Sequence, residues 1–509
     1  MKDRTQIDAL IHEKILDQLS SIEARLMHLE AGKGGTGAMP MIPALGSEVD
    51  ELRKLITHVN DRAASMRLDR QILGAPKYMV RKLAGKATQL PYRSKPIPRD
   101  PEKEAAKEAV RKKMTLKTDI VVVCPIYPGG TRAYGGEFVK RRVDAYRRDG
   151  LRVGVIEVQP ARKEIQRHYV GDAEVVRVNT SGLERVLRLS KPKVICVHHL
   201  EPHLWEAITP FAEETPVVIW VHGYEARPWQ ELAFNFTEED LKTLKPRLDK
   251  ANQDRSATMN AAFKHPNVTP VFVSKFMRGI AESFAGQEAI RGTVIHNSIT
   301  KTDFPYRKKT TEHRKRFLWV RSFSAVNYAS DISAAFIEGL SRKPYFDELS
   351  FSIYGQGKFF EETTEPLRRF PNVTIEERFL SGAEMRDAHA EHGMMIVPSR
   401  WDSQGLTCGE AMHSGLVPVT SDVAALPEFV GPDCAIMAKP DDVDWLVAQY
   451  DTLYKEPDLY LKMSRNAARR AESQCGRSST LAREIKLLKS FLPLPAKVAK
   501  SKAPRTFLI

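Results

Sequence analysis

Short runs of β-branched residues alternate with helix-forming segments from Lys117 onward, and this alternation constrains the fold more than any other feature of the sequence. The first two runs, 120–124 and 153–158, enclose a segment, 137–148, whose apolar residues recur at helical spacing. Further runs of the same kind follow at 175–178, 194–198, 217–221 and 269–273. Strands that alternate with helices in this way form a doubly wound parallel sheet, so we expect an α/β fold.

The same alternation resumes after residue 304 and predicts a second sheet. Its strands are expected at 317–320, 349–354, 373–375, 394–397 and 417–420. In doubly wound sheets, ligands bind beyond the carboxyl ends of the strands. Polar residues that directly follow a predicted strand are therefore the first candidates for a functional site.

One such stretch, 398–430, carries two acids with seven residues between them, Asp402 and Glu410. A glycine-containing turn at 405–407 lies between the acids, and a helix is expected to open near Glu410. A strand that leads through such a loop into a helix presents free N–H groups and the positive end of the helix, which suit a phosphate. Carboxylates on either side suit sugar hydroxyls. The combination predicts a site for a nucleotide sugar.

Further positions in this stretch follow a recognisable pattern. They are Glu410, Ala411, Met412, Gly415, Pro418, Val419, Pro427 and Glu428. The pattern resembles the donor-binding signature of the retaining glycosyltransferases of family 4, which have the GT-B fold, although Asp402 stands where Glu is commoner. The resemblance implies a metal-independent enzyme without a further cofactor. Such an enzyme transfers a sugar from a nucleotide diphosphate donor to an acceptor hydroxyl with retention.

The same resemblance assigns roles to residues of both predicted sheets. Arg321, at the end of the first strand of the second sheet, is expected to hold the donor diphosphate together with amides of the turn. Glu410 is expected to accept hydrogen bonds from ribose hydroxyls, and Asp402 from sugar hydroxyls. The complete set is His198, Asp402 and Arg321 as catalytic residues and Gly135, Gly136, Asn297, Gly405, Leu406, Thr407 and Glu410 as donor-binding residues.

Two of these assignments carry alternatives. Counting from the preceding Lys-Pro pair favours His198 as the strand-end histidine, whereas counting back from the following Glu-Pro pair shifts the register by one or two residues. The lysine that follows the arginine in the family is absent near Asn327, which removes a cation from a diphosphate site. Either another basic residue substitutes for it, or donor binding is weak. The candidates are Lys275, Lys315 and Arg316.

The resemblance also divides the chain. Residues 117–303 are expected to form an N-terminal Rossmann-like domain on the acceptor side, and residues 304–480 a C-terminal Rossmann-like domain on the donor side. Residues 481–509 are expected to form a helix that crosses back to the first domain, followed by a tail. Ahead of both domains, residues 1–72 have the apolar spacing of a helical hairpin or an oligomerising coiled coil. Residues 73–116 have the composition of a basic, proline-containing linker.

Charge and cysteine content bear on partners and location. The formal net charge is +14, and the segment 77–117 alone carries thirteen Lys and Arg against four Asp and Glu. Such a zone is either a solvated linker or a contact for an anionic partner, for which we favour a membrane surface or a lipid-linked saccharide over specific nucleic acid. Five cysteines without paired spacing indicate free thiols, and the first residues lack a signal core. We therefore expect a cytoplasmic protein, soluble or peripheral on the membrane.

Two other functions fit the same architecture. The absent lysine is compatible with a non-catalytic GT-B scaffold that only binds glycan or nucleotide. A sugar-nucleotide epimerase shares the two-domain architecture, but the Glu-Ala-Met context at 410–412 argues against it. Release of nucleotide diphosphate in the presence of an acceptor would distinguish a transferase from a scaffold. Conversion of a sugar nucleotide without any acceptor would indicate an epimerase.

Overall fold

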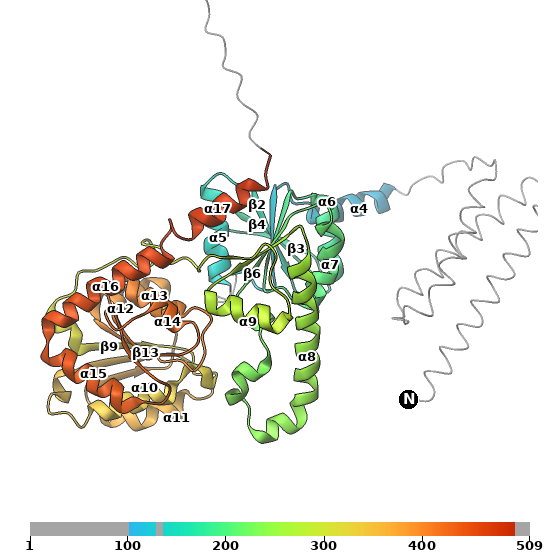
Figure 1. Ribbon diagram of the computed structural model, residues 1–509. Coiled ribbons are helices and arrows are strands. Elements are labelled where there is room, and N and C mark those ends of the chain that lie inside the picture. Colours follow the sequence, from blue (N-terminus) through green and yellow to red (C-terminus); the bar gives the residue numbers. More distant parts are fainter. Residues whose placement is uncertain (1–100, 129–135, 494–509) are drawn as a thin grey trace, which may run out of the picture. The chain divides into compact units, whose positions relative to one another are not determined.

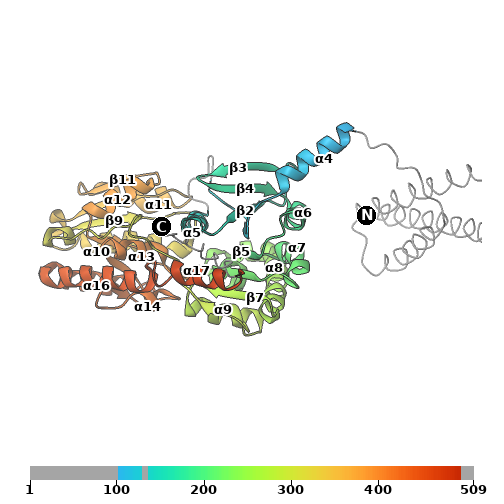
Figure 2. The same cartoon turned by 90° about the horizontal axis from the view of Figure 1, so that it is seen from above.

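The computed structural model of this chain describes residues 101–128 and 136–493, and the described residues after Glu104 belong to one compact unit. Two sheets organise this unit, and helices cover both faces of each sheet (Figures 1 and 2). The doubly wound α/β fold is therefore confirmed. The helical hairpin predicted for 1–72 and most of the predicted linker lie outside the described residues.

The first sheet has eight strands in the order β3-β4-β2-β1-β5-β6-β7-β8. The strands are β1 (Ile120–Cys124), β2 (Val153–Val158), β3 (Gln166–Val170), β4 (Ala173–Val178), β5 (Val194–His198), β6 (Val217–Val221), β7 (Val268–Phe272) and β8 (Thr293–Val294). All pair in parallel except β3, which lies antiparallel to β4 at one edge. The sequence did not predict β3, because its partly exposed polar residues form no apolar run.

Alternating side chains of the first sheet face two cores. The helices of this domain are α4 (Pro101–Met114), α5 (Glu137–Arg148), α6 (Thr180–Ser190), α7 (Pro202–Ala212), α8 (Glu238–Lys264) and α9 (Lys275–Ala285). Val121 and Val123 of β1 pack with residues of α6, α7, α8 and α9. Ile120 and Val122 pack on the other face with residues of α5 and of a C-terminal helix, α17 (Leu481–Ser490). A strand buried on both faces explains why β1 is an uninterrupted apolar run.

The second sheet is entirely parallel, in the order β11-β10-β9-β12-β13-β14. Its strands are β9 (Arg316–Val320), β10 (Ser350–Tyr354), β11 (Val373–Glu376), β12 (Met394–Ile396), β13 (Val417–Ser421) and β14 (Ile436–Ala438). Its helices are α10 (Ser330–Leu340), α11 (Phe360–Thr364), α12 (Gly382–Glu391), α13 (Leu406–His413), α14 (Leu426–Phe429), α15 (Val443–Lys455) and α16 (Pro457–Cys475). Phe317 and Trp319 of β9 pack with α10 and α15, and Leu318 and Val320 pack with α13 and α16.

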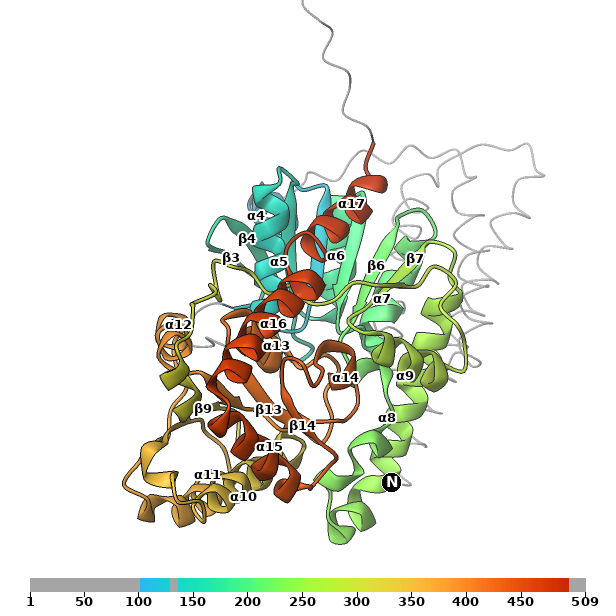
Figure 3. The same ribbon diagram turned by 60° about the vertical axis from the view of Figure 1, so that its left-hand side comes forward.

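After α16 the chain continues into α17, which packs on α5 of the first domain (Figure 3). Glu484 of α17 accepts hydrogen bonds from Arg142 Nε (3.1 Å), Tyr146 OH (2.5 Å) and Trp220 Nε1 (3.2 Å). The side chains of Arg142 and Glu484 are 2% and 0% exposed. A fully buried ion pair therefore holds the end of the described chain on the first domain.

All five cysteines are buried and free, which confirms the prediction of unpaired thiols. Within the part of the chain that the structure describes, no helix combines the length and the apolar composition needed to cross a membrane. The same residues hold no group of three or more His, Cys, Asp or Glu arranged to bind a metal ion.

Candidate functional site

The second-domain part of the site lies where β9 and β12 end. Arg321 follows β9 directly, and its backbone N–H donates to the carbonyl of Tyr354 (3.1 Å). Its Nη2 donates to Ser399 Oγ (2.6 Å) and lies 3.7 Å from Asp402 Oδ2. The side chain is 7% exposed, and its buried Nε has no hydrogen-bond partner among the described residues. A desolvated cation with an unused donor suits an anionic ligand.

The side chain of Asp402 closes the loop between Ser399 and Gly405. Asp402 Oδ1 accepts hydrogen bonds from the N–H groups of Gln404 (3.1 Å) and Gly405 (2.7 Å). Gly405 then leads into α13 with a φ of 76°, and a Cβ here would lie 2.4 Å from Leu426 Cδ2. The left-handed backbone and the close packing both require glycine at this position.

The structure corrects two details of the predicted anion site. Helix α13 begins at Leu406, one turn earlier than expected, so Glu410 lies in its second turn. The N–H of Gly405 is already bonded to Asp402, because a short acidic side chain can satisfy a nearby backbone donor as readily as a ligand can. The N–H groups of a first helical turn have no acceptor within the helix, and here they begin at Leu406 and continue through Thr407.

Glu410 faces the first domain from α13. Its Oε1 accepts a hydrogen bond from Arg141 Nη1 of α5 at 3.2 Å. Burial raises the pKa of Glu410, and the charge of Arg141 opposes this rise only in part. Arg141 also lies 3.5 Å from Asp303 Oδ2 and over the ring of Phe304. The acid predicted to bind ribose is thus paired with an arginine that the sequence analysis did not single out.

Asn297 lies in the segment between the two sheets, and protein contacts use its polar groups. Its Oδ1 accepts a hydrogen bond from Arg142 Nη2 (2.9 Å). Its backbone N–H donates to Gln404 Oε1 (2.7 Å), and its carbonyl accepts from Gln404 Nε2 (3.1 Å). Asn297 is only 5% exposed. Asn297 thus joins the loop before α13 to α5, and its contact with the donor stays a prediction.

His198, the histidine favoured from the sequence, is the last residue of β5 and is fully buried. Its ring stacks on Trp220, and its Nδ1 lies 2.9 Å from His222 Nε2. Burial, reinforced by neighbouring positive groups, lowers the pKa of both imidazoles well below the ordinary value, so both are neutral at pH 7. A side chain without exposed surface cannot touch a ligand, and His198 instead supports its neighbours.

The next residue, His199, is the accessible histidine of this strand end. Its side chain is 30% exposed, and its backbone has a φ of 56°. Its Nδ1 lies 3.3 Å from Glu225 Oε2, a buried carboxylate that also accepts hydrogen bonds from the N–H groups of His222 and Gly223. Burial acts to lower the pKa of His199, but the interactions with Glu225 outweigh it and raise the pKa. The sequence left the register of this histidine open by one or two residues, and the exposed surface of the side chain favours His199.

Two of the three basic residues considered as substitutes for the absent lysine lie at the wrong end of β9. Lys315 and Arg316 are at the start of β9, the opposite end of the strand from Arg321. Lys315 is paired there with two glutamates. Lys275 begins α9 of the first domain, and its backbone N–H donates to Glu428 Oε2 (2.9 Å). Lys315 and Arg316 are therefore excluded as phosphate contacts.

A different arginine, Arg400, lies beside Asn327. The N–H of Arg400 donates to the carbonyl of Asn327 (2.9 Å), and its guanidinium forms two hydrogen bonds with Asp331 (2.8 and 2.6 Å). The N–H of Asn327 itself donates to Asn235 Oδ1 in the first domain (3.2 Å). The sequence analysis missed Arg400 although it lies within 398–430, because the family pattern gives this position no role.

The structure describes only part of the loop between β1 and α5. Gly135 lies outside the described residues. Gly136 precedes α5 with a φ of 81°, and a Cβ here would lie 2.5 Å from the carbonyl oxygen of Ile126. The requirement for glycine at 136 is therefore conformational, and it sets the start of the helix that carries Arg141 and Arg142.

Comparisons with known proteins give a family match in the second domain. Residues 314–456 match the family described as Glycosyl transferases group 1. A stretch of 94 residues is 38% identical to the MMP alpha-(1->4)-mannosyltransferase of Mycolicibacterium hassiacum, and this match covers 18% of this chain and 23% of that protein. The chain thus spans less than a quarter of the length of this relative.

Solved structures extend the likeness over both domains. Sucrose-phosphate synthase from Thermosynechococcus elongatus superposes with a TM-score of 0.56 at 13% identity, covering 73% of this chain and 98% of that chain. Anabaena Alr3699/HepE, solved in complex with UDP, superposes with a TM-score of 0.53 at 13% identity, covering 73% and 100%. Identities this low show the fold alone. Taken with the two sheets and the family match, they confirm the GT-B fold and place residues 314–456 in the glycosyl transferases group 1.

Proposed function

We propose that this protein is a retaining glycosyltransferase that moves a sugar from a nucleotide diphosphate donor to an acceptor hydroxyl. The observation that carries the proposal is the meeting of Arg321, Asp402 and the first turn of α13 at the carboxyl ends of β9 and β12. The family match of the second domain supports it. The UDP bound by a protein of the same fold supports a nucleotide sugar as the donor.

In the proposed mechanism, the guanidinium of Arg321 and the N–H groups of Leu406 and Thr407 bind the diphosphate. They stabilise the negative charge that develops on it as the glycosidic bond breaks, so the reaction requires no metal. Asp402 accepts a hydrogen bond from a sugar hydroxyl through Oδ2, the carboxylate oxygen that makes no contact with the backbone of the loop. Glu410 exchanges its contact with Arg141 for the ribose hydroxyls, while Arg141 keeps its ion pair with Asp303. The acceptor approaches from the side of His199.

The acceptor in this proposal is a lipid-linked saccharide at the cytoplasmic face of a membrane, as in polysaccharide or glycoconjugate synthesis. A groove of about 980 Å³ lies between the end of α4 and β3. Its basic lining residues are Arg111, Lys112, Lys113, Lys117 and Arg167. Clustered cations of this kind attract anionic lipid headgroups. Association of the chain through the helices predicted in 1–72 is a further part of this proposal.

Thermal unfolding of the full chain with a panel of nucleotide sugars tests donor binding, because a ligand of the folded state raises the midpoint. Release of nucleotide diphosphate is then measured with the stabilising donor and candidate saccharide acceptors. We expect stabilisation by one donor and acceptor-dependent release. Stabilisation without release would indicate the scaffold. Conversion of the donor without acceptor would indicate the epimerase.

A further inference from the structure

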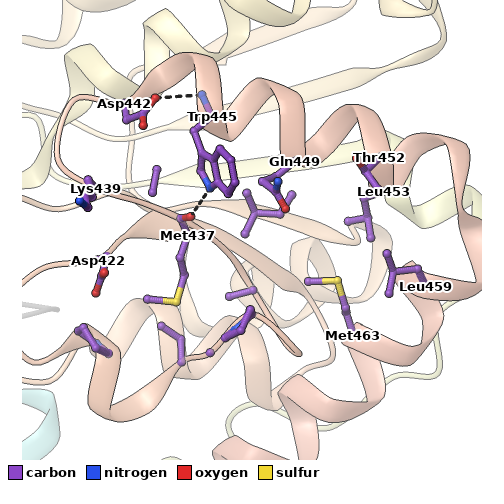
Figure 4. Close-up of a pocket in the computed structure, with 17 residues that line it drawn as sticks. Asp422, Met437, Lys439, Asp442, Trp445, Gln449, Thr452, Leu453, Leu459 and Met463 are labelled. Carbon is purple, nitrogen blue, oxygen red and sulfur yellow. Dashed lines mark hydrogen bonds between the residues drawn. The ribbon is translucent and has the colours of Figure 1, made fainter.

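A groove of about 730 Å³ runs along the outer edge of the second sheet, on the other side of β13 from Asp402 (Figure 4). Its floor is the edge strand β14, and its walls come from α15, from the residues that follow α14, and from the start of α16. Strand β13 separates β14 from β12, where the proposed donor site lies. The volume is in the range of roughly 300–1,000 Å³ that is usual for small-molecule sites.

The most prominent group of this groove is the indole of Trp445, which is 50% exposed. Its Nε1 donates to the carbonyl of Met437 on β14 (3.0 Å), and its backbone N–H donates to Asp442 Oδ1 (3.1 Å). Both bonds are visible in Figure 4 and fix the ring over the strand. A large aromatic face held in one orientation loses little conformational freedom when a ligand stacks on it.

Unused hydrogen-bonding groups surround the ring. Asp422 and Lys439 line the groove near the carboxyl ends of β13 and β14, and Gln449 follows Trp445 by one turn of α15 (Figure 4). Within the described residues, these three side chains make no hydrogen bond or ion pair. Asp442 uses only one of its carboxylate oxygens. The groove therefore offers free acceptors, a free cationic donor and an amide that can do both.

Apart from Thr452, whose hydroxyl donates to the carbonyl of Ala448, the remaining side chains of the lining are apolar and include Met437, Leu453, Leu459 and Met463 (Figure 4). A ligand of this groove must therefore present an apolar face and several hydroxyl or amide groups. The groove holds two carboxylates, Asp422 and Asp442, and one lysine, Lys439, so its net negative charge disfavours a phosphorylated ligand. A neutral sugar has the required form, since its C–H face stacks on an aromatic ring and its hydroxyls bond to carboxylates and amides.

We propose that the groove beside β14 is a binding site for neutral saccharides, separate from the donor site. The proposal goes beyond the proposed function and does not depend on it, because the groove would hold a glycan whether or not the chain transfers sugar. In a transferase, such a site would retain a saccharide through a segment that does not react.

The test uses the full chain and two probes, a linear neutral tetrasaccharide of glucose and one of mannose, with affinities measured by saturation-transfer NMR. We expect at least one probe to bind. Trp445→Ala should weaken its affinity about tenfold, the effect of about 1.4 kcal/mol expected for losing an aromatic contact. Gln449→Ala should weaken it about threefold, through one lost hydrogen bond. A matched control is Tyr306→Ala, which removes a partly exposed aromatic ring that lines neither groove and should change nothing.

Three results would overturn the proposal: neither tetrasaccharide binds, Trp445→Ala binds as tightly as the original chain, or UDP displaces the bound saccharide. Trp445 also covers the edge of β14, so its replacement can impair folding. If circular dichroism shows this, Gln449→Ala decides the question, because the change sits on the groove-facing side of a helix that tolerates alanine. Failure here leaves donor-dependent stabilisation and diphosphate release intact, so the two proposals fail separately.

Discussion

The second-domain side of the candidate site comes almost entirely from one stretch of sequence, whereas the first-domain side is assembled from the ends of separate strands. Ser399, Asp402 and Gly405 follow one another in a single loop, and only Arg321 joins them from another strand. On the first-domain side, His199 follows β5 and its partner Glu225 follows β6. A local pattern therefore identifies the first set, and packing alone brings the second together.

The two sides also use charge differently. Arg142 and Glu484 are 2% and 0% exposed and satisfy one another, so no ligand can reach them. Arg321 is also buried, yet it keeps an unused Nε and only a 3.7 Å contact with a carboxylate. We infer that the first pair stabilises the fold and that Arg321 serves a ligand. The following predictions test this difference.

The largest effect is expected for Glu484→Ala. This change leaves the buried Arg142 without its counter-charge and should lower the free energy of unfolding by about 3–5 kcal/mol. Denaturant unfolding measures it. The matched control is Glu184→Ala, which removes an exposed partner of Arg188 and should cost less than about 0.5 kcal/mol. Equal losses in the two variants would contradict a structural role for Glu484.

For Arg321→Ala we expect a large loss of activity and a small loss of stability. Its kcat/KM for donor should fall about 100-fold, or about 2.7 kcal/mol, because a charge-assisted contact to the diphosphate is lost. The free energy of unfolding should change less than in Glu484→Ala. Arg316→Ala, at the other end of β9, is the control and should retain kcat/KM. A stable Arg321→Ala protein with unchanged kcat/KM would remove this residue from the mechanism.

The pair of His199 and Glu225 should give stability a pH dependence. Glu225 raises the pKa of His199 above 6.5, against the effect of burial, so the pair contributes fully below pH 6.5. As pH rises through the raised pKa of His199, the imidazolium is lost and about 1 kcal/mol of stability should go with it. Unfolding from pH 6 to 9 measures this loss. Glu225→Gln should remove the contribution of His199 and leave the contributions of other groups such as Lys309, so a slope unchanged from that of the original protein would contradict the pairing.

The smallest effect concerns backbone strain. Lys191 follows α6 with a φ of 47°, a conformation that favours glycine. Lys191→Gly should therefore raise the free energy of unfolding by up to about 1 kcal/mol without affecting activity. Gly150→Ala makes the reverse change at a φ of 83° and should destabilise by a similar amount. A stabilisation by both variants would show that backbone strain is not the cause. His199 has the same kind of backbone, but glycine there would also remove the imidazole that pairs with Glu225.

Much of the fold follows from the sequence because the central strands are apolar on both faces. Runs such as 120–124 and 194–198 leave a parallel sheet covered by helices as the way to bury them. The edge strand β3 was missed because half of it remains in water and its residues carry no apolar signal. The turn before α13 was found because it contains a glycine, which the left-handed backbone at Gly405 requires.

By itself, the sequence determined the doubly wound architecture and the free cysteines, and the family resemblance predicted that Arg321 and Asp402 share a site. Only the tertiary structure decided that His199 rather than His198 is accessible, that Arg141 pairs with Glu410 and that Lys315 and Arg316 lie at the wrong end of β9. The physical reason is the range of the interactions. Periodicity and turn chemistry act between neighbours along the chain, whereas exposure and ion pairing depend on residues hundreds of positions apart that only packing brings into contact.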